Sequence, residues 1–266
     1  MTLLAAVQMT SGADKAQNLA TATSLIRKAA QRGAQFIGLP ENFAWMGPEP
    51  ERDRNAESLD GPTLSTLQSL AKELGVTVLA GSMLEGGAPG GRLFNTSVLF
   101  GPDGARLGVY RKMHLFDVEV GDGQTYRESA AVAPGTEVVV ANAPFGKVGL
   151  SVCYDLRFPE LYRKHSEAGA VLLTVPAAFT LATGKDHWEV LLRARAIENQ
   201  AYVIAPAQQG KHPKDRMTWG HAMIIDPWGL VTARASEGVG LAMAEFDEAL
   251  LAKVRRNLPA LQHRRL

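Results

Sequence analysis

The chain has 266 residues, of which 46% are hydrophobic and 21% are charged, so it can bury a substantial core. Its 28 Lys and Arg residues nearly balance 27 Asp and Glu residues, and the net charge of +1 lacks the basic surplus of a nucleic-acid-binding protein. No apolar run reaches the ~18–20 residues that a membrane-spanning helix needs.

The N-terminus and the cysteine content indicate a cellular compartment. Residues 1–8 have no basic leader and pass directly into strand-like sequence, so we expect no signal peptide. The single cysteine, Cys153, cannot form an internal disulfide, and nothing implies an oxidising environment. We therefore expect a soluble cytoplasmic protein without a nucleic-acid or membrane partner.

The first part of the chain alternates strands with helices. Strand-like runs cover residues 3–9, 36–39 and 76–80, and apolar residues at helical spacing predict helices over 15–32 and 63–74. The middle and the end add two predicted hairpins, 93–100 with 106–110 and 223–225 with 230–232. Between them we expect a strand ending at Cys153, a helix over 159–168, a strand over 171–175 and a helix over 186–200.

This order predicts an α/β protein with mixed sheets and helices outside them. We see no internal repeat and no change of composition that marks a domain boundary, so residues 1–266 are expected to form one domain. The Gly- and Pro-rich segment 86–91 reads as a turn, because a phosphate-binding loop would need a following helix and a lysine.

Cys153 lies at the predicted C-terminal end of a strand, just before Pro159 opens a helix. Ligands of α/β sheets bind at such strand ends, and nearby N–H groups and the helix dipole would favour a thiolate. A lone cysteine can equally be a small buried hydrophobic residue. Glu41 and Lys112 also follow predicted strands, although a solvated surface position explains either residue alone.

Three segments together resemble the nitrilase superfamily of carbon–nitrogen hydrolases. The family has a Glu after a strand, a Lys in Tyr-Arg-Lys-x-His, and a Cys in Cys-Tyr-Asp-x-Arg-Phe-Pro-Glu. Here these are Glu41, Lys112 and Cys153, in the family's order, and the family's second glutamate matches Glu128. The resemblance runs nearly end to end and implies a four-layer α-β-β-α sandwich, a homodimer or higher homo-oligomer, and no metal or organic cofactor.

The branch that the chain resembles most is that of the deaminated glutathione amidases, with the ω-amidases beside it. Segments 207–212, 236–238 and 262–265 favour the first branch, whereas Lys185 departs from the small residue or proline that is usual there. The resemblance thus implies hydrolysis of deaminated glutathione to 2-oxoglutarate and cysteinylglycine. The alternatives are an ω-amidase for 2-oxoglutaramate, then a nitrilase or N-carbamoyl hydrolase, and a catalytically silent scaffold of the same fold.

The resemblance also implies roles for the four residues. Glu41 is the general base, and Cys153 attacks the amide to form a thioester. Lys112 and the backbone N–H of Tyr154 stabilise the oxyanion, and Glu128 holds Lys112 charged and aimed.

Further candidates follow from position. Arg157 could hold a substrate carboxylate or pack the turn through an ion pair, and Phe179 and Thr180 are candidates for the pocket wall. The charged loop 211–216 could meet an anionic substrate or be merely solvated. A Cys–His pair with His114, His165, His187 or His221 stays open as an alternative, with His114 expected to support the site through hydrogen bonds.

Overall fold

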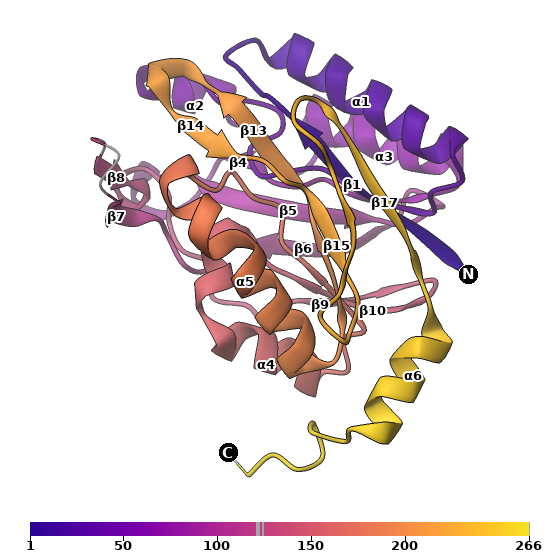
Figure 1. Ribbon diagram of the computed structural model, residues 1–266. Coiled ribbons are helices and arrows are strands. Elements are labelled where there is room, and N and C mark those ends of the chain that lie inside the picture. Colours follow the sequence, from indigo (N-terminus) through magenta and orange to yellow (C-terminus); the bar gives the residue numbers. More distant parts are fainter. Residues whose placement is uncertain (121–122, 124, 266) are drawn as a thin grey trace.

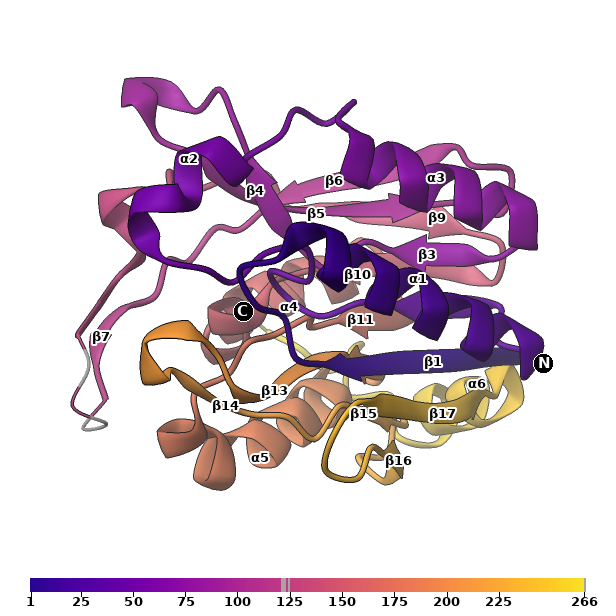
Figure 2. The same cartoon turned by 90° about the horizontal axis from the view of Figure 1, so that it is seen from above.

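Two β-sheets lie face to face between two helical layers in the computed structural model, which describes residues 1–120, 123 and 125–265 (Figures 1 and 2). Within these residues the first sheet has nine strands. Their order is β14 (Met217–Trp219), β13 (Ala207–Lys211), β1 (Thr2–Met9), β2 (Phe36–Gly38), β3 (Thr77–Leu79), β5 (Phe94–Phe100) and β4 (Met83–Glu85), with β17 (Gly240–Phe246) paired to β1 and β6 (Arg106–Arg111) paired to β5.

The second sheet of the described part has six strands. Their order is β16 (Val231–Arg234), β15 (Met223–Ile225), β12 (Tyr202–Ala205), β11 (Leu172–Thr174), β10 (Gly146–Leu150) and β9 (Val140–Ala143). A separate ribbon of β7 (Asp117–Glu119) and β8 (Thr125–Arg127) projects from the body (Figure 1). Both sheets are mixed: β1, β2 and β3 are parallel, as are β10, β11 and β12, whereas β5–β6 and β15–β16 are antiparallel.

Helices cover the outer face of each sheet. The first sheet carries α1 (Lys15–Gln31) and α3 (Pro62–Leu74), and the second carries α4 (Pro159–Glu167) and α5 (Leu181–Asn199) (Figure 2). Two further helices are the short α2 (Arg52–Asn55) and the C-terminal α6 (Glu248–Asn257), which extends from the body in Figure 1. Single 3₁₀ turns are η1 (Glu49–Glu51), η2 (Pro89–Gly91), η3 (Glu128–Ala130), η4 (Cys153–Arg157) and η5 (Pro213–Asp215). None of the helices in this part of the chain has the length and apolar character to cross a membrane.

Strand β1 shows why its sequence reads as an unbroken apolar run. Side chains of a strand alternate between faces, so Leu4 and Ala6 join the core between the sheets, while Ala5 and Val7 pack toward the helices. Both faces are therefore buried, as expected for a strand covered on each side. The predicted four-layer α-β-β-α sandwich is confirmed.

Two predicted boundaries were wrong. The strand expected to end at Cys153 ends at Leu150, because the backbone N of Val152 turns to the Asp155 side chain instead of continuing the ladder with β11. The helix expected from residue 186 begins at Leu181, after an extended Thr180. Its first turns contain Gly184, a weak helix former that is kept there because a Cβ would lie 2.3 Å from the Trp219 side chain.

Candidate active site

Cys153 occupies a strained turn that follows β10 of the second sheet. It begins η4 with a φ of 48°, which a residue with a side chain seldom adopts. Its backbone N donates to the carbonyl of Pro176 at 2.9 Å, which ties the turn to the segment after the neighbouring strand β11. Such strain persists only where surrounding structure enforces it, and it is frequent at functional sites.

The buried carboxylate of Asp155 enforces this turn. One oxygen accepts hydrogen bonds from the backbone N of Val152 at 2.8 Å and from the hydroxyl of Tyr110 at 2.7 Å. The other accepts from the backbone N of His114 at 3.0 Å and lies 2.7 Å from its ring Nδ1. Burial and the adjacent Asp155 charge raise the pKa of Tyr110, which stays a donor. Asp155 thereby joins the cysteine turn to the segment that follows Lys112.

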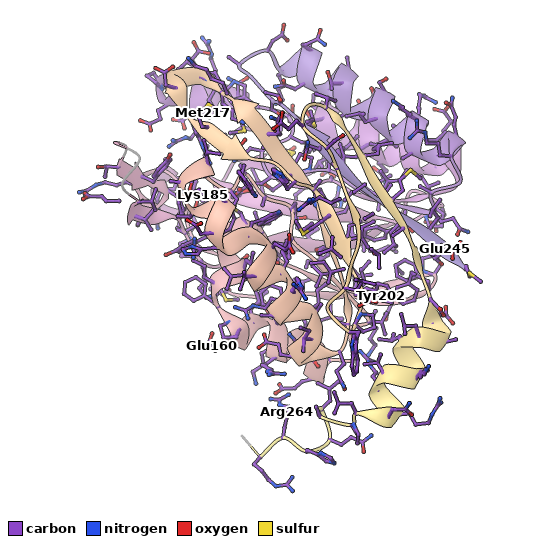
Figure 3. The ribbon with its side chains drawn as sticks, in the orientation of Figure 1. Glu160, Lys185, Tyr202, Met217, Glu245 and Arg264 are labelled. Atoms are coloured by element: carbon purple, nitrogen blue, oxygen red, sulfur yellow. The ribbon has the colours of Figure 1, made fainter. Side chains whose placement is uncertain are left out.

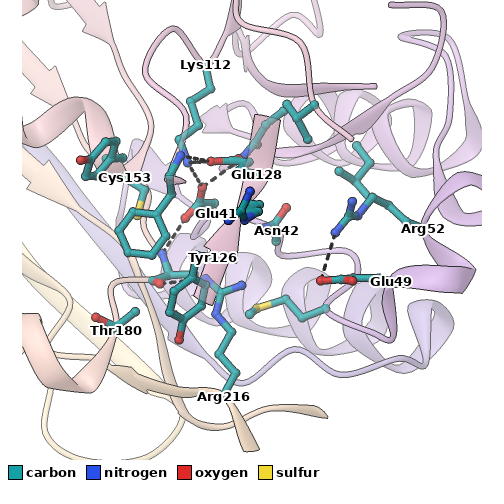
Figure 4. Close-up of a pocket in the computed structure, with 18 of the residues that line it drawn as sticks. Glu41, Asn42, Glu49, Arg52, Lys112, Tyr126, Glu128, Cys153, Thr180 and Arg216 are labelled. Atoms are coloured by element: carbon teal, nitrogen blue, oxygen red, sulfur yellow. Dashed lines mark hydrogen bonds and ion pairs between the residues drawn. The ribbon is translucent and has the colours of Figure 1, made fainter. Parts of the chain in front are cut away.

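Lys112 lies between two carboxylates (Figure 4). It directly follows β6, and its Nζ is 2.9 Å from Oε1 of Glu41 and 2.8 Å from Oε2 of Glu128. Glu128 also accepts from the backbone N of Phe116 at 2.7 Å. Lys112 and Glu41 are almost completely buried, so the ammonium is held by charge and hydrogen bonds rather than by water.

Glu41 follows β2 and is aimed by groups distant in the chain. Its Oε2 accepts from the backbone N of Ala178 at 2.9 Å. Gly81 lets the neighbouring β3–β4 loop approach the backbone before Glu41, since its φ is 24° and an added Cβ would lie 2.0 Å from the carbonyl oxygen of Pro40. The carboxylate therefore has a defined position before any substrate arrives.

Asn95 is a site residue that the sequence reading missed. From β5, its Nδ2 donates to Oε1 of Glu41 at 3.0 Å and to Oε1 of Glu128 at 3.1 Å, and its side chain is buried. One amide group thus aligns both carboxylates that flank Lys112. The available signal was the polar run of Asn95, Thr96 and Ser97 inside a predicted strand, because polar side chains are buried in a strand only when they find partners.

The charges of these groups define the resting state. Burial would raise the pKa of Glu41, but the Lys112 charge and hydrogen bonds from Cys153 and Lys112 lower it overall. Burial would lower the pKa of Lys112, but Glu128 and Glu41 raise it overall. Burial and the Glu41 charge raise the pKa of Cys153 well above its usual value. The raised pKa favours a neutral thiol beside the Glu41 carboxylate and opposes the effect of the N–H groups and helix dipole, which would favour a thiolate.

The pocket around these groups contains most of the predicted substrate-binding residues. Tyr154, Phe179 and Thr180 line it, together with Glu41, Lys112, Glu128 and Cys153. Arg157 is not among the lining residues: its guanidinium lies over the rings of Phe179 and Tyr154, at 5.1 and 5.8 Å, and its Nη1 is 3.3 Å from Nδ1 of His187. The described arginines that do line the pocket are Arg52 of α2, Arg127 of β8 and Arg216 after η5.

The four histidines considered as partners of Cys153 have other surroundings. Among the described residues that line the pocket there is no histidine. His114 contacts Asp155 and stacks on Phe158 with ring centroids 3.8 Å apart, and His221 stacks on Trp219. His165 is buried, which lowers its pKa to about 4. The group that the structure sets beside the thiol is thus the carboxylate of Glu41. The described residues hold no cluster of three or more His, Cys, Asp or Glu suited to a metal ion.

Replacing Asn95 by Asp is expected to lower kcat/KM by about 10- to 100-fold. The change removes the shared donor and adds a third carboxylate, so the pKa of Glu41 rises. The acidic limb of the pH–rate profile therefore moves to higher pH, because Glu41 loses its basic form earlier as pH falls. The measurement is kcat/KM against pH, with the exposed Asn142→Asp as a charge-matched control. An unchanged profile in Asn95→Asp would contradict the assigned contact.

Comparison with known proteins identifies the class of enzyme. Residues 3–256 match the carbon–nitrogen hydrolase family model, and the chain belongs to this family, whose members act on carbon–nitrogen bonds. It is similar to the deaminated glutathione amidase of Synechocystis sp., with 52% identity over 265 residues that cover 98% of this chain and 97% of the relative. It is also similar to the omega-amidase of Mus musculus, with 38% identity over 98% of this chain and 94% of the relative.

Solved structures agree with the fold. Saccharomyces cerevisiae Nit3, a member of branch 10 of the nitrilase superfamily, superposes with a TM-score of 0.90 and 29% identity, covering 100% of this chain and 97% of that one. The predicted superfamily is therefore confirmed.

Proposed function

We propose that the chain, as one carbon–nitrogen hydrolase domain over residues 1–266, is a cysteine-dependent amidase that hydrolyses deaminated glutathione. The observation that carries the proposal is the buried ammonium of Lys112 held between two carboxylates, one of which contacts the neutral thiol of Cys153. The substrate is supported by the 52% identity with a relative that bears this name. The products are 2-oxoglutarate and cysteinylglycine.

The first half-reaction forms a thioester. Glu41 takes the thiol proton as the sulfur of Cys153 bonds to the amide carbon, and the carbonyl electrons move onto oxygen. Lys112 and the backbone N–H of Tyr154 stabilise this oxyanion, a contribution for which one donor is typically worth about 10²–10³ in rate. The carbonyl then re-forms, the carbon–nitrogen bond breaks, and Glu41 returns the proton to the departing nitrogen.

The second half-reaction regenerates the enzyme. Glu41, again ionised, takes a proton from water as the water oxygen bonds to the thioester carbon. The carbon–sulfur bond breaks, the proton on Glu41 goes to the leaving sulfur, and the carboxylic acid product departs. Glu128 keeps Lys112 charged and aimed throughout, while Phe179 and Thr180 contact the acyl chain.

The second candidate is an ω-amidase that acts on 2-oxoglutaramate. The 38% identity with an omega-amidase over nearly the whole chain favours it, and the two substrates share the 2-oxoglutaryl group. The same catalytic groups serve both reactions, so only the leaving group distinguishes them.

The test is release of 2-oxoglutarate from deaminated glutathione and from 2-oxoglutaramate in parallel, with Cys153→Ala as the control. We expect a higher kcat/KM for deaminated glutathione and no release by the variant. A preference for 2-oxoglutaramate would establish the second candidate instead. Absence of release from both substrates would overturn the proposed activity.

Compartment and assembly belong to the same proposal. A catalytic thiol must stay reduced, which favours the cytoplasm. We propose a homodimer that forms through the outer face of α5, where Val190 and Ile197 are exposed beside the exposed Trp228 of the β15–β16 turn. Light scattering of the purified chain checks this, since a monomer's molar mass would contradict it.

A further inference from the structure

Arg216 extends into the cavity from the segment after η5 (Figure 4). Its Nη2 donates to the carbonyl of Ala178 at 3.2 Å, and the N–H of the same residue donates to Glu41. Its guanidinium carbon is 5.7 Å from the ring centroid of Tyr126. These contacts set the cation close to the catalytic base, and its charge contributes to the lowered pKa of Glu41.

The guanidinium has an unused hydrogen-bonding edge. Its Nε is buried and has no hydrogen-bond partner, and no carboxylate of the described residues lies within ion-pairing distance of it. Arg52, by contrast, points to Glu49, 3.9 Å away, on the side of the pocket opposite Cys153 (Figure 4). A buried donor without a partner is costly, so this edge is suited to a ligand that completes it.

The geometry of the guanidinium and the charges around it indicate the chemistry of that ligand. A guanidinium presents parallel N–H groups that match the two oxygens of a carboxylate. Among the described residues, the cavity lining has four cations, Arg52, Lys112, Arg127 and Arg216, against the three carboxylates of Glu41, Glu49 and Glu128. Lys112 is already shared by Glu41 and Glu128, which leaves Arg216 as the inner cation for an anionic substrate.

We propose that Arg216 binds the carboxylate at the far end of the substrate's acyl chain and so selects amides of dicarboxylic acids; this rests on the proposed function. The acyl carboxylate of a 2-oxoglutaryl amide is four bonds from the scissile carbonyl carbon, whereas the glycyl carboxylate of deaminated glutathione is six bonds away. Arg216 and the catalytic base both contact the backbone of Ala178, so Arg216 is placed to bind the nearer carboxylate. The other lining arginines, Arg52 and Arg127, remain available to contact the leaving group.

The test compares two amides that differ only in the carboxylate. Glutaramate carries it, and pentanamide has the same carbon chain without it. Arg216→Gln should lower kcat/KM for glutaramate by about 10- to 100-fold, mainly by raising KM, and should lower the value for pentanamide by a much smaller factor, through the small change at Glu41. The exposed Arg27→Gln on α1 removes the same charge elsewhere and should change neither. An equal loss for both amides would mean that Arg216 only supports the Ala178 loop, which would overturn the proposal.

Deaminated glutathione and 2-oxoglutaramate provide a second test, which distinguishes the acyl carboxylate from the glycyl carboxylate. The kcat/KM for both substrates should fall by a similar factor in Arg216→Gln, because the two substrates share the acyl carboxylate. A loss confined to deaminated glutathione would place the glycyl carboxylate at Arg216 and overturn the assignment to the acyl group.

A binding measurement separates this inference from the proposed activity. Glutarate should protect Cys153 from alkylation by iodoacetamide in the wild type, and protection should require about 10-fold more glutarate in Arg216→Gln. This result would uphold the carboxylate site even if no amide were hydrolysed. Equal protection of both proteins would overturn it even if deaminated glutathione were hydrolysed.

Discussion

Lys112→Met is expected to lower kcat/KM by about 10³-fold and to destabilise the folded chain by about 3–5 kcal/mol at neutral pH. The activity falls because the oxyanion loses its cationic donor. The stability falls because Glu41 and Glu128, joined through Lys112 at 2.9 and 2.8 Å, become two carboxylates without a counterion in a buried site. Methionine is unbranched and only one atom shorter than lysine, so lost volume contributes little to either effect.

The stability loss depends on pH in a defined direction. In the wild type the folded-state pKa of Glu41 is lowered, so its contribution is present above its unfolded pKa of about 4.3 and is lost as pH falls. Without Lys112, burial and mutual repulsion raise the folded-state pKa of the pair. The variant's deficit therefore grows as pH rises above about 4.3 and is smallest in acid.

Urea denaturation of both proteins at acidic and neutral pH measures this difference. The exposed Lys253→Met on α6 is the matched control and should follow the wild type. A deficit of the same size at every pH would show that lost packing, rather than the unpaired carboxylates, accounts for the change.

Glu41→Gln is expected to lower kcat/KM by about 10³–10⁴-fold while preserving the fold. Glutamine has the same shape and can still meet the N–H of Ala178, but it cannot accept the thiol proton or pass it to the leaving nitrogen. Lys112 keeps Glu128 as its partner, so no buried charge is left alone.

The same substitution should change the titration of Cys153. Burial contributes most to the raised pKa of this thiol, and the charge of Glu41 adds to it, whereas Lys112 opposes it. Removing the Glu41 charge therefore lowers the thiol pKa, and the rate of alkylation begins to rise at a lower pH. The rate of hydrolysis should thus fall in this variant, while the fraction of thiolate at a given pH rises.

Alkylation kinetics against pH, measured beside turnover, check both effects. Glu245→Gln serves as the control, since this exposed residue lies on β17 at the edge of the molecule (Figure 3). A thiol pKa that rises in Glu41→Gln, or a variant that retains a tenth of the activity, would contradict the assigned role of Glu41.

The sequence by itself determined the features that depend on neighbours in the chain. Apolar spacing predicted α1 and α3 to within a residue or two, and the turn residues between β5 and β6 and between β15 and β16 predicted both hairpins. The motifs around Lys112 and Cys153 also led to the family, which the comparisons confirm. The sequence pattern did not predict β13, β14, β17 or α6. Strand β13 mixes polar and small residues, and β14 has three residues, too few to show alternation.

Only the tertiary structure decided which other groups meet at the site. Glu41 takes its second support from the backbone of Ala178, which is 137 residues away, and a backbone N–H has no signature in sequence. Asn95 and Arg216 belong to the pocket because a strand and a loop from distant parts of the chain converge there, whereas Arg157, four residues from Cys153, does not line it. Proximity in the chain does not set the direction of a side chain, since that depends on the backbone angles of the turn and on packing between distant segments.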